Sequence, residues 1–148
     1  MKIEKITSRK NPYIIHLRAL CADGGYRREK REYACDGMKL LCEAVEKGAE
    51  IRSVLWKEKA QAAGLGESVR QYEAPEGLYD YVSPMKNSPG PLFTLTMPEP
   101  DAGARITNAI ALENVQDPGN IGTVIRTAAA LGIDAVILLG ACADVFSP

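Results

Sequence analysis

The residues with types and spacing suited to chemistry lie between Ala111 and Gly140, in the stretch ALENVQDPGNIGTVIRTAAALGIDAVILLG. A buried strand, a polar turn and a helix are predicted there, and open α/β sheets bind ligands at such strand-to-helix loops. Helix N-terminal amides attract anions, and Arg126 follows Gly122 by one helical turn, so its side chain can lie back toward the loop. An arginine there can hold a phosphate through two parallel hydrogen bonds. The alternative is an exposed arginine paired with an acidic neighbour.

The helix that must position Arg126 has clear predicted ends. Asp117 is suited to cap it, Pro118 fits its first position, and Gly132 fits its end. The segments AIALENV before it and IDAVILLG after it are apolar enough to form strands buried on both faces. Strand, helix and strand together predict a βαβ unit with parallel strands. The buried stripe of the helix is expected to contain Ile121, Val124, Ile125, Ala128 and Ala129.

The chain before this segment is predicted to alternate between helices and strands. One helix is predicted to start at Pro12, which fits the first turn, although Ser8 could also cap a helix here. Gly24 and Gly25 are predicted to end it. Trp56 ends an apolar strand, so core packing is favoured for it over stacking on a nucleic-acid base. The remaining expectations are a strand at 33–35, a helix at 38–48, a strand at 51–56, a helix with a glycine break over 57–74, a short helix from 77, and a strand at 92–98.

Length and composition are typical of a soluble globular protein. The N-terminal residues lack the apolar core and cleavage site of a signal peptide, so a cytoplasmic protein is expected. The chain has 148 residues, 46% of them hydrophobic and 25% charged, which suits one ordinary domain or two small ones. A Pro/Gly/acidic stretch predicts a linker at residues 101–105, between a domain at 1–100 and the start of another at 106–148. No apolar run approaches the roughly 20 residues of a membrane span, so no membrane partner is expected.

The four cysteines show no CxxC spacing and a single histidine accompanies them, so no metal site is expected and the cysteines are predicted to be reduced and mostly buried.

Positive charge is concentrated at the N-terminus. Residues 1–31 contain nine Lys and Arg against three Asp and Glu, although the whole chain has a net charge of −1. Lys and Arg release condensed counterions when they meet phosphates, so a basic N-terminal region indicates a polyanionic partner. A solvated helix face is the alternative explanation of the same charges.

The segment NVQDPGNIGTVIRTAAALGIDAVIL resembles the first conserved motif of the SpoU/TrmH family (SPOUT superfamily) of RNA ribose 2′-O-methyltransferases. Asn114, Asn120, Gly122 and Arg126 all match its pattern of an asparagine, a short gap and N-x-G-x-x-x-R. The stretches ITSRKNPYIIHLRAL and YACDGMKLLCEAVEKG look like the substrate-binding domain of many members. The resemblance therefore implies an α/β protein, in which a ribosomal-protein-like α/β/α RNA-binding domain precedes the first βαβ unit of an α/β-knot methyltransferase domain.

The resemblance also implies a reaction and its residues. The family transfers a methyl group from S-adenosylmethionine to a ribose 2′-hydroxyl of rRNA or tRNA, and Arg126 matches its catalytic arginine. Because a guanidinium stays protonated, Arg126 suits holding a phosphate and stabilising the 2′-oxygen better than acting as a base. Asn120 is expected to orient the loop and the ribose, while Asn114 and Gly122 support the motif. Candidate RNA-binding residues are Arg9, Lys10, Asn11, Arg27, Arg28 and Arg31.

The chain departs from the family pattern after the motif. Family members continue well past it, with segments that form the knot, most of the cofactor pocket and much of a homodimer interface. The resemblance thus implies a truncated chain, with cofactor-binding residues beyond Pro148, inactive alone and homodimeric when full length. The turn at Ser88–Pro91 also replaces the Pro-Gln-Gly of the family.

Two alternatives remain open at this point. One is a non-catalytic RNA-binding module that retains the substrate domain. The other is a Rossmann-like nucleotide-binding protein, which is disfavoured because the strand after the helix lacks an acidic residue at its end.

Overall fold

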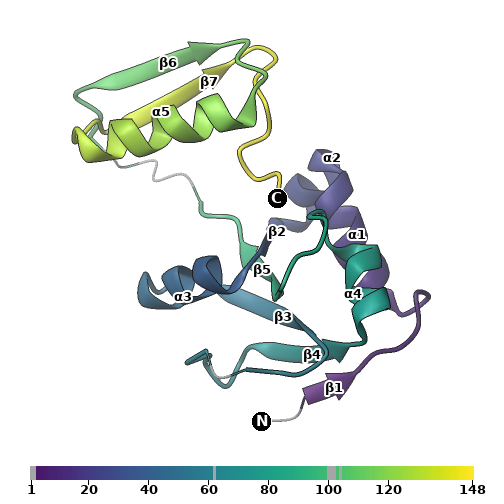
Figure 1. Cartoon of the computed structure of the whole chain (residues 1–148). Helices are drawn as coiled ribbons and strands as arrows, with labels where there is room; N and C mark the ends of the chain where they lie inside the picture. Colours follow the sequence, from purple (N-terminus) through teal and green to yellow (C-terminus); the bar gives the residue numbers. More distant parts are fainter. Residues whose placement is uncertain (1–2, 62, 100–102, 104) are drawn as a thin grey trace. The chain divides into compact units, whose positions relative to one another are not determined.

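The chain divides into two compact units in a computed structural model that describes residues 3–61, 63–99, 103 and 105–148 (Figure 1). The first unit comprises Met1–Pro98 with Phe146–Pro148, and the second comprises Glu99–Val145. The predicted linker at 101–105 lies mostly outside the described residues. None of the helices in the described part of the chain has the length and apolar character needed to cross a bilayer.

The first unit is built on a five-stranded mixed sheet with the order β1-β4-β3-β5-β2. β1, β4 and β3 run parallel, whereas β5 is antiparallel to both of its neighbours, β3 and β2. The strands are β1 (Ile3–Lys5), β2 (Glu32–Asp36), β3 (Ile51–Lys57), β4 (Arg70–Ala74) and β5 (Leu92–Thr96). This arrangement confirms a mixed α/β fold, while the likeness to a ribosomal-protein domain stays a prediction.

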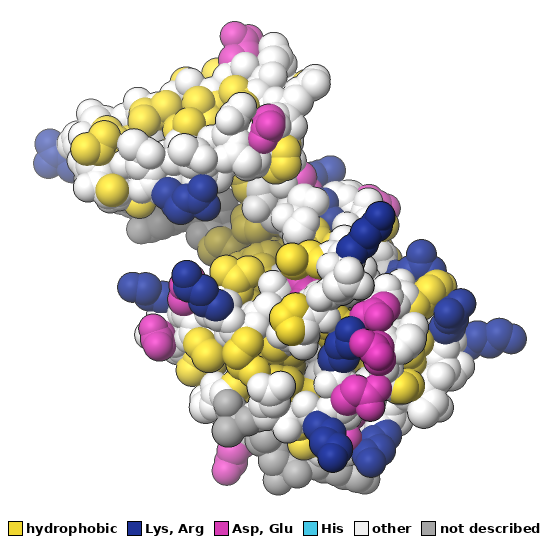
Figure 2. All heavy atoms as spheres, in the orientation of Figure 1, with side chains coloured by type: hydrophobic (Ala, Val, Ile, Leu, Met, Phe, Trp, Pro, Cys, Tyr) yellow, Lys and Arg dark blue, Asp and Glu magenta, His cyan; other side chains and the backbone are white. Residues whose placement is uncertain are grey.

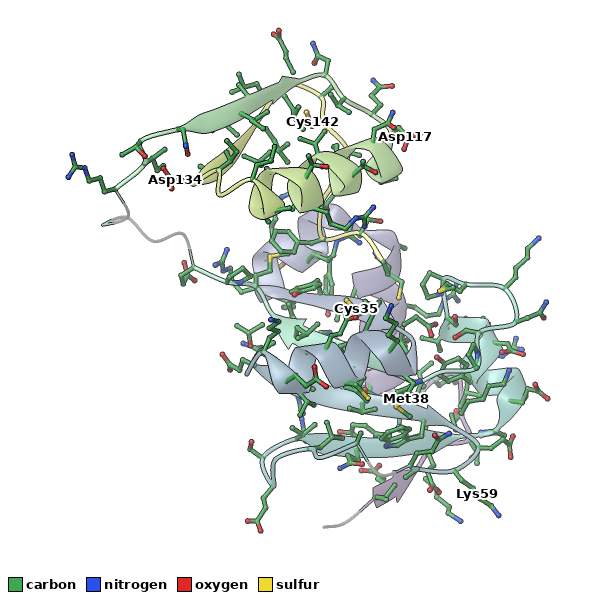
Figure 3. The ribbon with its side chains drawn as sticks, turned by 60° about the vertical axis from the view of Figure 1, so that its left-hand side comes forward. Cys35, Met38, Lys59, Asp117, Asp134 and Cys142 are labelled. Atoms are coloured by element: carbon green, nitrogen blue, oxygen red, sulfur yellow. The ribbon has the colours of Figure 1, made fainter. Side chains whose placement is uncertain are left out.

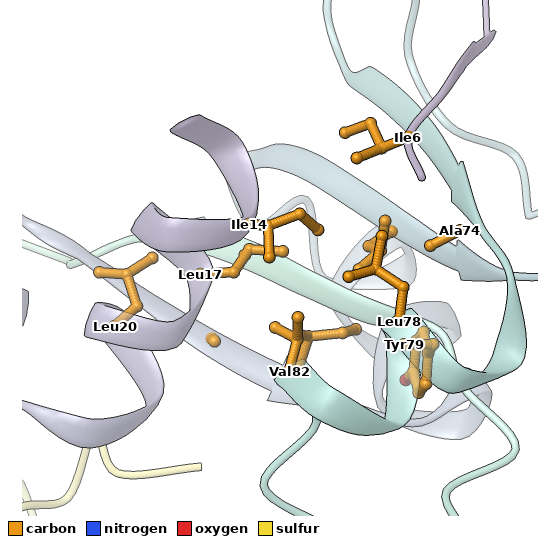
Figure 4. Close-up of a cluster of buried hydrophobic side chains, with 11 residues drawn as sticks. Ile6, Ile14, Leu17, Leu20, Ala74, Leu78, Tyr79 and Val82 are labelled. Carbon is orange, nitrogen blue, oxygen red and sulfur yellow. The ribbon is translucent and has the colours of Figure 1, made fainter. Parts of the chain in front are cut away.

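Helices cover both faces of this sheet (Figure 1). One face is covered by α1 (Pro12–Ala22), α2 (Gly24–Lys30) and α4 (Glu76–Val82), and the other by α3 (Met38–Glu46). On the first face, Ile14, Leu17 and Leu20 of α1 pack at helical spacing against the sheet and α4 (Figure 4). On the second face, Trp56 is 1% exposed and its indole N–H donates to Oε1 of Gln71 at 3.0 Å. The expected core position of Trp56 is confirmed.

The start of α1 agrees with the sequence prediction, but its end does not. Pro12 begins the helix as expected, and the side chain of Asn11 caps it by accepting from the N–H of Tyr13 at 2.8 Å. The two glycines do not end the helical region, because Gly24 begins α2. Asp23 separates the helices, and its carboxylate accepts from the N–H groups of Gly25 and Tyr26. This cap satisfies donors at the start of α2 and offsets the poor helix propensity of glycine.

The helix predicted over 57–74 is wrong. β3 extends to Lys57, a loop containing Gly64 and Gly66 follows, and Arg70–Ala74 form β4. β4 is the parallel partner of both β3 and β1, so backbone pairing on two sides outweighs the helix propensity of its residues. β1 escaped prediction because three exposed residues are too short a run to show alternation.

The second unit has the βαβ organisation that the sequence predicts. It consists of β6 (Ala109–Glu113), α5 (Pro118–Ala130) and β7 (Ala135–Leu139), and the two strands pair in parallel with Ala111 opposite Ile137. Asp117 caps α5 and Pro118 occupies its first position. Gly132 follows α5 with a φ of +68°, a conformation that favours glycine.

The strands of this unit are not buried on both faces, which corrects the sequence prediction. The side chains of Ile137 and Leu139 are 43% and 47% exposed, and Ile125 of the predicted stripe is 38% exposed. Ile121 and Ala128 are buried. α5 lies on one side of the two strands (Figure 1). Hydrophobic side chains (yellow) lie on the surface of this unit in Figure 2.

The cysteines also depart partly from expectation. All four are free thiols, and Cys42 is exposed, while the other three are half-buried. Burial raises the pKa of the Cys21 and Cys35 thiols to about 11, so both are protonated near neutral pH.

Candidate active site and nucleic-acid interface

The candidate active site is the loop between β6 and α5 with the first two turns of that helix. The Asp117 carboxylate accepts from the N–H of Asn120 at 3.0 Å, which fixes the backbone at the start of α5. The hydroxyl of Thr123 donates to the carbonyl of Gly119 at 2.9 Å and reinforces the same turn. The side chain of Asn120 is exposed at this turn. A short, well-capped turn therefore presents Asn120 to solvent.

Arg126 folds back toward this turn. Its Nη1 lies 3.8 Å from the position that a Cβ on Gly122 would occupy, and its Nη2 is 3.4 Å from Oγ1 of Thr123. The guanidinium is exposed and lies over the residues that begin the helix. The predicted orientation is thus seen in the structure, whereas the catalytic role of Arg126 stays a prediction.

Asn114 and Gly140 join the carboxyl ends of the two strands. Asn114 has a φ of +56° and its side-chain oxygen accepts from the N–H of Ala141 at 2.8 Å. Gly140 has a φ of +63°, and a Cβ at this position would collide with Oδ1 of Asn114. The side-chain oxygen of Asn114 therefore holds the backbone at the end of β7. Gly140 was not singled out from the sequence, although a glycine directly after an apolar strand is a sign of a special backbone conformation.

Gly140→Ala is expected to destabilise the second unit by about 1–3 kcal/mol, because it combines a left-handed backbone with displacement of the Asn114 side chain. Hydrogen exchange at the Ala141 amide measures the loss directly. Gly122→Ala is the matched control, because a Cβ there meets Arg126 only at an ordinary contact distance and alanine favours a helix. Equal exchange rates in the two variants would contradict this role of Gly140.

The opposite ends of β6 and β7 are joined by a separate set of hydrogen bonds. Asp134 accepts from the N–H and hydroxyl of Thr107 and from the N–H of Asn108, at 2.7 to 3.1 Å. These bonds, led by the Thr107 hydroxyl, hold the pKa of the Asp134 carboxyl below its usual range. Asp117 and Asp134 lie at opposite ends of the unit in Figure 3. Asp134 therefore stabilises the fold away from the candidate site.

The candidate RNA-binding residues of the first unit occupy different environments. Arg9, Lys10 and Arg28 are exposed. The side chain of Asn11 caps α1, and Arg31 has a φ of +52° and donates to the carbonyl of Pro98. On the face shown in Figure 2, basic side chains are interspersed with acidic ones. The structure does not bring the six predicted residues into one continuous basic surface.

Arg27 is a correction to the predicted interface. It is only 4% exposed, and its Nη1 donates to the carbonyl of Leu20 at 2.6 Å and to that of Cys21 at 3.4 Å. These carbonyls belong to the last turn of α1, whose C-terminal acceptors need donors. The guanidinium of Arg27 is committed to the interior and is not available to a phosphate.

Arg27→Met is expected to lower the free energy of unfolding of the first unit by about 2 kcal/mol, the scale of a hydrogen bond to a charged group. The change keeps the aliphatic stem and removes the donors. Urea unfolding followed by fluorescence of Trp56, the single tryptophan, reports on this unit. Arg28→Met, at the exposed neighbouring position, is expected to change stability little; equal effects of the two substitutions would show that the Arg27 bonds are unimportant.

A polar network surrounds the buried Glu32 carboxylate beside α1. Nδ1 of His16 is 3.0 Å from the Tyr26 hydroxyl, and its Nε2 is 3.2 Å from the Glu32 carboxylate, which also meets Arg52 at 3.5 Å. Burial raises the pKa of Glu32, but hydrogen bonds from His16 and Thr94 and the charge of Arg52 outweigh it, so the net shift is downward. Each of these side chains therefore has a polar partner within the network. No group of three or more metal-ligating side chains is found within the described residues.

The chain is similar to known RNA methyltransferases in sequence and in fold. Residues 107–148 match the model of the SpoU rRNA methylase family. An uncharacterized tRNA/rRNA methyltransferase of Synechocystis is 32% identical over 157 residues, covering 99% of this chain and 56% of that protein. The 23S rRNA (guanosine(2553)-2′-O)-methyltransferase of Bacillus subtilis is 30% identical, and the match covers 82% of this chain and 49% of that protein.

Solved structures are similar in fold and in sequence. The crystal structure of an AdoMet-bound rRNA methyltransferase from Sinorhizobium meliloti superposes with a TM-score of 0.76 at 28% identity, covering 98% of this chain and 57% of that one. The chain thus spans about half the length of the relatives that it matches.

Proposed function

The chain belongs to the SpoU/TrmH family, and we propose that it carries the RNA-binding unit and the first catalytic motif of an enzyme that methylates a ribose 2′-hydroxyl of rRNA or tRNA. One observation carries the proposal: Arg126 folds back over Gly122 toward the capped start of α5. This arginine lies in the segment that matches the family model. The two relatives described above are bacterial enzymes, and on that similarity the proposed place of action is the cytoplasm.

Arg126 has the chemistry to hold the RNA and to stabilise charge. S-adenosylmethionine would supply an electrophilic methyl group, and its demethylated form would be the neutral thioether. The guanidinium of Arg126 would hold a phosphate next to the reacting ribose and stabilise negative charge on the 2′-oxygen. Because it stays protonated, it is no base, and the proton of the 2′-hydroxyl would pass to the phosphate that it holds. Asn120, exposed on the same turn, would orient the ribose.

The residues that hold the methyl donor are not assigned within residues 1–148. The side-chain oxygen of Asn114 accepts from the N–H of Ala141, and this side chain lies against Gly140, so Asn114 serves the fold at this turn. We therefore propose roles for Arg126 and Asn120 toward RNA only. The donor would be bound largely by other residues of the working enzyme.

The exposed apolar side chains of the second unit support a larger assembly. Ile137 and Leu139 of β7 are nearly half exposed, and a two-stranded sheet with one covering helix leaves apolar surface open. We propose that further chain and a second copy cover this surface in the working enzyme, which would be a homodimer.

The test is methyl transfer from labelled S-adenosylmethionine to total RNA, followed by nuclease digestion and nucleoside analysis. It should be run on this chain and on any longer gene product that contains it. The expected result, when the longer product is the enzyme, is label in a 2′-O-methylated nucleoside of the RNA. Label in a base would overturn the ribose assignment, and no label in either protein would overturn the enzymatic proposal.

A non-catalytic RNA-binding module is the second candidate function. The exposed Arg9, Lys10 and Arg28 favour it, because these cations belong to the first unit and not to the motif, and phosphate contacts need no catalytic residue. RNA binding by a longer product that transfers no methyl group would support this candidate.

A further inference from the structure

Two arginines share one tyrosine ring on the surface of the first unit. The guanidinium carbon of Arg9 lies 4.2 Å from the centroid of the Tyr81 ring, and that of Arg18 lies 4.1 Å from the same centroid. Arg18 also donates a short hydrogen bond to the Tyr81 hydroxyl. The three residues come from the loop before α1, from α1 and from α4. We call Arg9, Arg18 and Tyr81 the arginine–tyrosine stack.

The stack holds two positive charges together without neutralising them. Within the described part of the chain, neither guanidinium forms an ion pair with a carboxylate, and the side chains of Arg9 and Arg18 are exposed. Each cation–π contact at such a site contributes about 0.5–1 kcal/mol, while the two like charges repel each other. An anion that meets both cations removes that repulsion, so the favoured occupant is negatively charged.

The local structure presents these cations in a defined geometry. The loop before α1 is tied by bonds from the Lys10 N–H to the Ser8 hydroxyl and from the Asn11 N–H to the Ser8 carbonyl, both at 3.1 Å. Arg18 lies on α1, one turn beyond Ile14, whose buried side chain packs that helix against the core. The flat ring of Tyr81 restrains both guanidinium groups, which lowers the entropic cost of binding an anion.

Phosphate is the anion that this arrangement fits best. Guanidinium groups bind phosphate through two parallel hydrogen bonds, and a pair of them can contact neighbouring phosphates of one strand. Lys10, which follows Arg9 in the sequence, adds a further exposed cation to this loop. Such contacts give affinity and position, and they carry no sequence information.

We propose that the arginine–tyrosine stack is a phosphate-binding site that docks the RNA strand on the first unit. The inference rests on the proposed function, because it concerns how the same RNA is held. Arg18 and Tyr81 were not among the residues expected from the sequence. They become part of the interface because the fold brings α1 and α4 together.

Binding of fluorescently labelled bulk tRNA and fragmented rRNA to the 148-residue chain tests the proposal. Arg18→Gln is expected to weaken binding about fivefold or more. On single-stranded RNA it should also reduce the slope of log K against log salt by about 0.7 for each phosphate that the variant no longer neutralises. Tyr81→Leu should weaken binding similarly because it removes the ring. Tyr81→Phe keeps the ring and should retain most of the affinity.

Lys39→Gln is the matched control, because it removes one positive charge from α3 on the other face of the sheet, where Lys39 is 90% exposed. The stack would be overturned, with RNA binding left intact, if Arg18→Gln bound RNA as strongly as Lys39→Gln while Arg28→Gln bound RNA more weakly. If the chain bound a polyglutamate peptide but did not bind RNA, both the stack and the proposed RNA contact would be overturned. Circular dichroism of each variant checks that the fold is kept.

Discussion

Replacing Arg126 with lysine is expected to slow methyl transfer by about 10²–10³-fold, the scale of losing one group that stabilises transition-state charge. Lysine keeps the positive charge but not the planar fork that binds a phosphate through two hydrogen bonds. The reduction should appear mainly in kcat, because the interaction with the 2′-oxygen strengthens as its charge develops. Single-turnover transfer of label to RNA, in the longest gene product that is active, measures the effect.

Arg105→Lys is the matched control for this experiment, since Arg105 is an exposed arginine of the same unit outside the motif. It should leave the rate unchanged. Thermal unfolding of both variants should match the parent protein, because the Arg126 side chain is exposed and adds little to stability. A rate for Arg126→Lys close to that of the parent would rule out the two-bond role of the guanidinium.

Replacing Asp36 with alanine is expected to destabilise the first unit by about 3 kcal/mol, the scale of leaving buried donors without their charged acceptor. Asp36 is 8% exposed and accepts from the hydroxyl of Tyr79 at 3.0 Å, from that of Ser83 at 2.6 Å, and from that of Ser88. Tyr79 and Ser88 are themselves buried, so alanine would leave their hydroxyls without a partner. Burial, together with the nearby Asp36 carboxylate, raises the pKa of Tyr79, which keeps it a donor.

This carboxylate ties the end of β2 to α4 and to the loop before β5. The Ser88 hydroxyl also accepts from the N–H of Gly90, in the turn where the chain departs from the family pattern. Urea unfolding followed by Trp56 fluorescence measures the loss. Asp36→Asn should cost less because the amide oxygen still accepts. Asp80→Ala should cost under about 1 kcal/mol, because the Asp80 carboxylate is 43% exposed and its partner Lys57 keeps a second ion pair with Glu76. Equal midpoints for Asp36→Ala and Asp80→Ala would show that the network does not stabilise this unit.

Local signals predicted the second unit well. Asp117, Pro118 and Gly132 act within one turn of the helix that they bound, so neighbouring residues alone decide where α5 begins and ends. The apolar segments on either side became parallel strands as expected. The direction of Arg126 follows from helix geometry as well, because a helical side chain lies over the turn before it.

Charge alone could not separate structural from exposed arginines. Arg27 and Arg28 are neighbours in a basic run, yet Arg27 is buried against the end of α1 while Arg28 is exposed. The difference arises because α2 follows α1 directly and turns one side chain onto the carbonyls of Leu20 and Cys21. Residues 70–74 were misassigned for a similar reason, since strand pairing with distant segments decided their conformation.

The motif, the capped helix that carries Arg126 and the βαβ order of the second unit could be predicted from local sequence, because each depends on residues a few positions apart. Which polar groups meet follows only from the packed fold: Asp36 contacts Ser88, 52 positions away, and Arg18 contacts Tyr81, 63 positions away. Contacts at such separation depend on how β2, α1 and α4 pack around one core. Their energies come from burial and from satisfied hydrogen bonds, which no local pattern of residue types encodes.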